Sequence, residues 1–244
     1  YLSLSICEPL SAAGMDWLYF ALMGLIAILL GSFGSVFNTY SGLYLAKDND
    51  LLLSMPIPVG VIMTARLLVV YIMGLLYSGV VIIPAAAVYL IKISATVGSV
   101  IGSFMSVLLI SVFVLTLSCI LGWVVAKISL KLKNKSVITV FVSIMFLAAY
   151  YFVYFKAQSL ISELIANAAV YGEKIKGSAY PIYLAGKAGA GDPAALAIVT
   201  AVVIALFALM WVLISRSFLK TATSAGKNAK KKYRSTAVAE RRLP

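Results

Sequence analysis

Side chains that carry out chemistry are scarce in this sequence. It contains no His, and its two cysteines, Cys7 and Cys119, lie far apart in the chain, so no zinc-binding set is present and a disulfide is not expected. No Gly-rich loop ends in Lys-Ser or Lys-Thr, and the apolar stretches contain no paired carboxylates. We therefore predict a protein that is not an enzyme and that uses no metal and no cofactor.

One polar segment stands out, KDNDLLLSMPIP at residues 47–58. Asp48 or Asn49 can cap a short helix whose first turn favours Asp50, and Pro56 ends that helix. Its leucines would be exposed and would need either lipid or a groove on a partner protein. The residues that we assign to a docking role are Asp48, Asp50, Leu51, Leu52, Leu53 and Pro56.

Composition places the elements around this segment in a membrane. Of 244 residues, 63% are hydrophobic and 11% are charged, and the mean hydropathy is +1.05, whereas soluble domains carry about 25% charged residues. Five stretches without Asp, Glu, Lys or Arg are long enough to cross a bilayer, which takes about 20 apolar residues. They are residues 17–46, 67–91, 93–126, 136–155 and 193–215. We predict an all-α polytopic helix bundle of five spans, or six if a span precedes Tyr1.

Basic residues predict the orientation, because Lys and Arg near span ends stay on the cytoplasmic side. Fifteen of the 20 basic residues fall after the first, third and fifth stretches. The loop Lys47 to Arg66 and the C-terminal tail are therefore predicted to be cytoplasmic, in a multi-pass plasma membrane protein. Residues 1–216 form the predicted permease domain and residues 217–244 a basic tail or linker. Because no aromatic residues are interleaved with the basic ones, we expect anionic lipid as the tail's partner and no nucleic acid.

The spans themselves lack ionisable side chains, and this bears on how such a protein could work. Ion-coupled carriers usually place Asp, Glu, Lys or His inside their spans. Any transport by this chain should then draw its energy from a partner. Broken helices can bind sodium through backbone carbonyls, so a carrier remains an alternative.

Small residues predict where the helices pack. Gly31 and Gly34 in the first span, and Gly98 and Gly102 in the third, form stripes that allow another helix to approach closely. We read these stripes as helix-packing surfaces rather than as substrate contacts.

Two motifs resemble a known family. YLAKDNDLLLSMPIP, residues 44–58, followed by Arg66, resembles the cytoplasmic loop of type-two ABC exporter permeases, where an acidic residue, a Leu run and a Leu/Met-Pro-Ile element precede the next span. AYPIYLAGKAGAGDP, residues 179–193, resembles the external segment before the final span of the same family. The resemblance covers most of the chain, as an architecture and two short motifs.

The resemblance implies a function. The docking segment would be the coupling helix that binds a separate cytoplasmic ABC ATPase, and residues 156–192 would hold short external or re-entrant helices. The chain would be the permease subunit of a bacterial exporter, completed by a second half from the same chain, a twin copy or another subunit. A carrier or channel without ATP, and a membrane scaffold without transport, are the alternatives. The residues do not identify a substrate.

Overall fold

The computed structural model describes residues 2–44, 57–93, 96–131, 140, 144–145, 147–148, 151–152, 163 and 167–215. Helices make up these residues almost entirely, and no strand occurs among them. The predicted all-α fold class is confirmed.

Four helices are long and apolar enough to cross a membrane: Asp16–Val36, Gly60–Lys92, Val97–Lys127 and Pro193–Ser215. The first three belong to α2 (Asp16–Thr39), α4 (Val59–Lys92) and α5 (Val97–Lys131), and α2 continues into the π-helical turn η1 (Tyr40–Tyr44). They match the first, second, third and fifth predicted spans. Most of the fourth, residues 136–155, lies outside the described residues.

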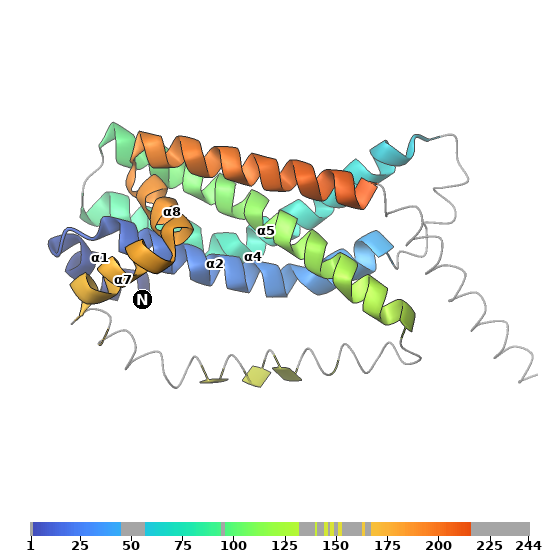
Figure 1. Ribbon diagram of the computed structural model, residues 1–244, viewed down its shortest axis with the longest axis horizontal. Helices are drawn as coiled ribbons and strands as arrows, with labels where there is room; N and C mark the ends of the chain where they lie inside the picture. Colours follow the sequence, from blue (N-terminus) through green and yellow to red (C-terminus); the bar gives the residue numbers. More distant parts are fainter. Residues whose placement is uncertain are drawn as a thin grey trace, which may run out of the picture.

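Three short helices gather at one end of the bundle: α1 (Leu2–Ala12), α7 (Ala168–Ser178) and α8 (Tyr180–Ala190). Figure 1 shows them on the left, at the same end as the connection between α4 and α5, while the long helices run across the view. We call this the α8 end and the other, where α5 finishes, the opposite end. Every loop predicted to be external that the structure describes lies at the α8 end.

Local chemistry sets the helix boundaries. Pro58 is extended, with φ −56° and ψ 131°, and its carbonyl accepts from the backbone N–H of Val61 at 2.9 Å, so α4 begins at Val59. Arg66 therefore lies two turns inside α4. The loop that we predicted to run from Lys47 to Arg66 ends at Pro58 instead. At the start of α5, Thr96 Oγ1 accepts from the backbone N–H of Ser99 at 3.2 Å, as an N-capping residue does.

Two buried clusters hold the bundle together, one at each end. At the α8 end, residues of α1, α2 and α4 surround Tyr19, whose hydroxyl donates to the Ala85 carbonyl at 2.8 Å. At the opposite end the cluster joins η1, α4, α5 and the helix Pro193–Ser215. Its buried members are Leu43, Met63, Leu67, Val70, Leu115, Cys119, Ala126, Met210 and Ile214. Four chain segments that are distant in sequence therefore share one core at that end.

Candidate functional site

Helix α8 packs tightly against α2 through its glycines. A Cβ atom on Gly186 would overlap the backbone oxygen of Trp17, and one on Gly189 would lie 2.5 Å from Cγ of Phe20. Because backbone and ring atoms cannot move aside cheaply, both positions require glycine for this approach. The rings of Trp17 and of Tyr183 on α8 also pack in a T-shaped arrangement, with ring centroids 4.8 Å apart. The first turns of α2 thus fix the position of α8.

The turn that ends α8 lies on the small-residue stripe of α5. Gly191 adopts φ +103°, and the N–H groups of Gly191 and Asp192 donate to the carbonyls of Ala188 and Lys187 at 3.2 and 3.1 Å. These two bonds form a Schellman motif. A Cβ on Gly102 would lie 2.6 Å from the Ala188 oxygen, and one on Gly98 would lie 3.2 Å from the Gly191 oxygen. The turn therefore packs directly against Gly98 and Gly102 of α5.

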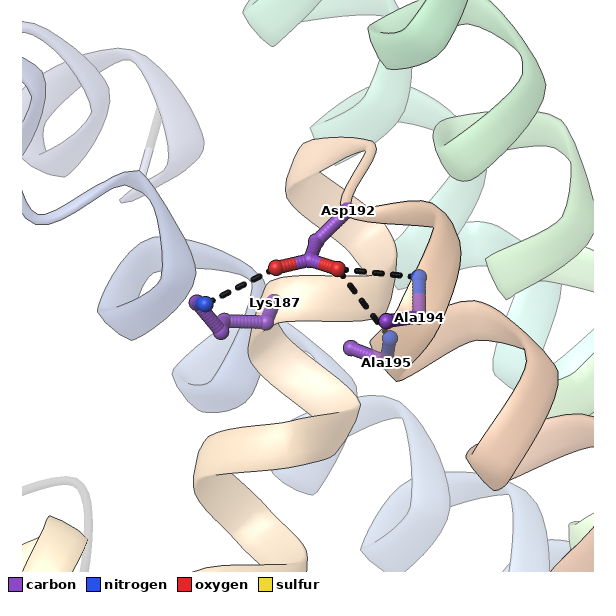
Figure 2. Close-up of polar contacts among 4 residues, drawn as sticks. All are labelled: Lys187, Asp192, Ala194 and Ala195. Atoms are coloured by element: carbon purple, nitrogen blue, oxygen red, sulfur yellow. Dashed lines mark hydrogen bonds and ion pairs between the residues drawn. The ribbon is translucent and has the colours of Figure 1, made fainter.

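Asp192 connects α8 to the following helix, as Figure 2 shows. Its Oδ1 accepts from the backbone N–H groups of Ala194 and Ala195 at 3.0 and 3.1 Å, which caps the helix Pro193–Ser215. Its Oδ2 accepts from Lys187 Nζ at 2.8 Å. Pro193 suits the first helical position, which needs no N–H donor.

Electrostatics reinforce this junction. The hydrogen bond from Lys187, followed by the backbone N–H of Ala195, holds the pKa of the Asp192 carboxyl below its usual value. The same hydrogen bond raises the pKa of Lys187. Both groups therefore stay charged over the whole neutral range, and the link between α8 and the last helix persists throughout it.

An apolar cavity of about 390 Å³ lies beneath α8. Its walls come from α2, α5, α8 and the helix Pro193–Ser215, and among its lining side chains only Ser106 carries a polar atom. Gly24, Ala21, Ala185 and Ala188 contribute little volume, which leaves the space open. A cavity lined in this way suits an uncharged, apolar group.

A second hollow, of about 490 Å³, lies at the α8 end. It is bordered by the turn between α1 and α2 and by α7, and it includes Trp17, Tyr183, Glu173 and Lys176. Aromatic rings beside opposite charges are typical of the level of lipid head groups. The two hollows share no lining residue, although α2 and α8 contribute to both.

Ionisable groups within the described spans lie near their ends. Asp16, Lys92 and Lys127 occupy terminal positions of the candidate spans, and Arg66 lies in the second turn of its span. Lys92 forms an ion pair with Glu8 of α1 at 3.0 Å. Between these end turns, the four described spans contain no ionisable side chain other than cysteine and tyrosine. Among the described residues no group of three or more His, Cys, Asp or Glu side chains could hold a metal ion.

Comparison with known proteins places the chain among multi-span membrane proteins. The model of a family described as "Membrane protein of 12 TMs" matches residues 3–242. The chain belongs to this family. No curated protein and no solved structure that we compared with the chain matches it.

The predicted docking segment falls outside the described residues. That applies to Asp48, Asp50, Leu51, Leu52, Leu53 and Pro56. The chain on both sides of the segment is described, and it is firmly anchored. Leu43 of η1 and Met63 of α4 are 0% and 2% exposed and belong to the same buried cluster at the opposite end. The same cluster contains residues of α5 and of the helix Pro193–Ser215.

The other two predicted packing glycines lie on α2, where Gly31 faces both α4 and α5 and Gly34 faces α4. A Cβ on Gly31 would lie 2.9 Å from Cγ1 of Val114 and 3.0 Å from Cβ of Ser78, and one on Gly34 would lie 2.9 Å from Cγ of Tyr77. Nearby, Ser35 and Ser118 share a hydrogen bond of 2.5 Å between α2 and α5. Hydroxyls of this kind hold membrane helices together.

The sequence did not predict the close packing of α8 against α2 and α5, or the cavity beneath α8. Gly186, Gly189 and Gly191 form a visible small-residue pattern in AGKAGAG, and this pattern could have suggested close packing. The partners could not be found in the same way, because they come from the starts of α2 and α5, far away in the chain. The helix α1 was also not predicted.

Proposed function

We propose that this chain is the transmembrane permease subunit of an ATP-driven ABC exporter, moved by a separate cytoplasmic ATPase and completed by a second permease half. The observation that carries the proposal is the anchoring of the docking segment: the residues just before and after it, Leu43 and Met63, are buried in one core with α5 and the helix Pro193–Ser215. A partner that grips residues 47–58 would thereby act on the whole bundle.

Two further observations support this function. Membership of a multi-span family fits a transporter, and the described spans lack the internal carboxylates, lysines and histidines with which carriers bind and relay ions. The loop sequence also resembles the coupling loop of type-two exporters. An external energy source fits these features better than an ion gradient does.

The docking role is tested by charge substitution in the Leu run. The double variant Leu52→Asp and Leu53→Asp should abolish co-purification with the ATPase encoded nearest to this chain, because two carboxylates cannot enter an apolar groove without a large desolvation cost. The matched control is Leu2→Asp with Leu4→Asp, since both leucines are exposed on α1 at the α8 end. The control should retain the ATPase.

Three outcomes would contradict the proposal. Co-purification unchanged by the Leu52 and Leu53 substitutions would refute the docking helix. Transport by vesicles that lack ATP and every ATPase subunit would favour a carrier or channel. A partner ATPase whose rate responds neither to this chain nor to any ligand would favour a scaffold.

A further inference from the structure

We propose that the cavity beneath α8 binds the alkyl chain of an amphipathic molecule. This inference goes beyond the proposed function, because it names a ligand class and does not depend on an ATPase. It rests on the chemistry of the cavity lining, on its depth in the bundle and on its opening toward lipid.

The lining determines what can enter. Eighteen residues from four helices face the cavity, none of them is charged, and Ser106 supplies the single side-chain hydroxyl. A charged or strongly polar group would lose its hydration here without gaining partners. A hydrocarbon chain has no such hydration to lose. The volume of the cavity, about 390 Å³, falls within the range of known ligand cavities.

The depth of the cavity matches the hydrocarbon layer. On α2 the lining runs from Phe20 to Ile28, within the candidate span Asp16–Val36. At 1.5 Å per residue, this places the cavity roughly 6 to 18 Å from the start of the span. Acyl chains fill that level of a bilayer, whose hydrocarbon core is about 30 Å thick.

The cavity is not sealed at the level of the spans. Leu25 and Val202, two of its lining residues, are 38% and 52% exposed. On the side of the α8 end, Leu184, Ala185 and Ala188 of α8 cover it. A ligand therefore reaches the cavity from the lipid side, with its hydrocarbon part inside.

A single flexible chain fits the space that Gly24 and the three alanines leave open. The bound molecule is thus a membrane lipid or a single-chain amphiphile, which share this alkyl chemistry.

Photolabelling tests the site. The purified protein is placed in phosphatidylcholine nanodiscs that contain a trace of a lysophospholipid with a diazirine on its alkyl chain, and labelled residues are mapped by mass spectrometry after irradiation. We expect labels concentrated on cavity residues, above all on Ser106 and Phe113. The substitution Val202→Trp, which fills the opening, should lower labelling at these residues at least threefold.

The same substitution two residues away provides the control. Ile204 is 59% exposed but does not line the cavity, so Ile204→Trp should leave the labelling unchanged. Ala185→Leu fills the cavity from α8 and serves if Val202→Trp does not remain monodisperse. A parallel probe with the diazirine on a two-chain phospholipid separates the sources: labelling by both probes indicates membrane lipid, and labelling by the lysophospholipid alone indicates a single-chain ligand.

Three results would overturn the inference. Labels spread evenly over the lipid-facing surface would mean that the cavity has no preference for the chain. Equal labelling of the Val202→Trp and Ile204→Trp variants would mean the same. Cavity residues that stay unlabelled while others react would show that another protein segment or a second copy covers the opening. Because no ATPase is present, none of these results bears on the docking role.

Discussion

At the residue scale, Asp192 has three structural roles. One carboxyl oxygen caps the last helix and the other accepts from Lys187, while its own backbone N–H completes the turn that ends α8. The link between α8 and the helix Pro193–Ser215 therefore depends on one ionised side chain.

The first prediction concerns the charge of Asp192. Asp192→Asn keeps a capping side chain but removes the ion pair, so we expect the Tm of the protein in detergent to fall by a few degrees at pH 7. Because folding lowers the pKa of this carboxyl from its usual 3.8, its contribution is complete above that value and is lost as the pH falls through the lower folded pKa. The difference in Tm between wild type and variant should therefore be constant from about pH 5 to pH 8 and should shrink below pH 4.

Glu8→Gln is the matched control for this measurement. It removes the ion pair with Lys92, whose two side chains are largely exposed, and exposed pairs contribute little. We expect no measurable change in Tm at any of these pH values. An equal loss in the two variants would mean that the junction at Asp192 has no special role.

Single residues also show how far sequence reasoning reached. Gly98 and Gly102 were predicted to be a packing surface, and the structure places the turn of α8 on them. Their spacing indicates close approach but says nothing of what approaches, because the partner lies about 90 residues further along the chain. Burial, followed by the carboxylates of Asp16 and Glu8, raises the pKa of the Cys7 thiol, a feature that the sequence pattern did not indicate.

At the element scale, α8 is held by glycines on both sides of its interface. Its own glycines face α2, and Gly102 of α5 faces its last turn. With so little side-chain volume between them, the backbones of α5 and α8 come into direct contact. This is the arrangement by which membrane helices gain van der Waals energy where water does not drive them together.

The second prediction tests this interface by adding one methyl group. Gly102→Ala should destabilise the protein by about 1 to 3 kcal/mol, because the new Cβ meets backbone atoms of Ala188 and Gly191 and the helices must separate. Gly60→Ala, in the first turn of α4, meets no atom within 4 Å. It should be neutral or stabilising by up to about 1 kcal/mol, since alanine favours helix. Thermal unfolding in detergent measures both, and equal values would contradict the packing role.

Helix ends were harder to predict than helices. Charge-free stretches located four of the spans, but they placed the start of the second at residue 67, although α4 begins at Val59. A helix continues past the hydrocarbon layer as long as its backbone allows, so a charge such as Arg66 marks a limit for lipid and not for the helix. Pro58, whose conformation stops the hydrogen-bond ladder, was the better signal.

At the scale of the whole molecule, the described elements fall into two groups by position. The short helices and the connection between α4 and α5 lie at the α8 end, while the chain segments that flank the predicted docking segment lie at the opposite end. This division follows the distribution of Lys and Arg in the sequence. The bundle could be predicted from composition alone, whereas the cavity could not, because it arises where four helices fail to fill a space.

The third prediction assigns the two ends to the two sides of the membrane. In a background with Cys7→Ala and Cys119→Ala, Ser178→Cys at the exposed end of α7 should react with a membrane-impermeant maleimide in intact cells. Lys227→Cys in the basic tail should react only after permeabilisation, because basic segments stay in the cytoplasm. Labelling in the reverse pattern would invert the orientation.

Helix α5 extends from one end of the bundle to the other. Its 35 residues extend about 52 Å at 1.5 Å per residue, well beyond the hydrocarbon layer, and no proline interrupts them. Gly98 and Gly102, which contact the turn that ends α8, lie in the first turns of α5. Ala126, near the last turns of α5, is buried in the cluster at the opposite end. One continuous helix thus belongs to the packing at both faces of the membrane, and each of its ends has its own set of contacts.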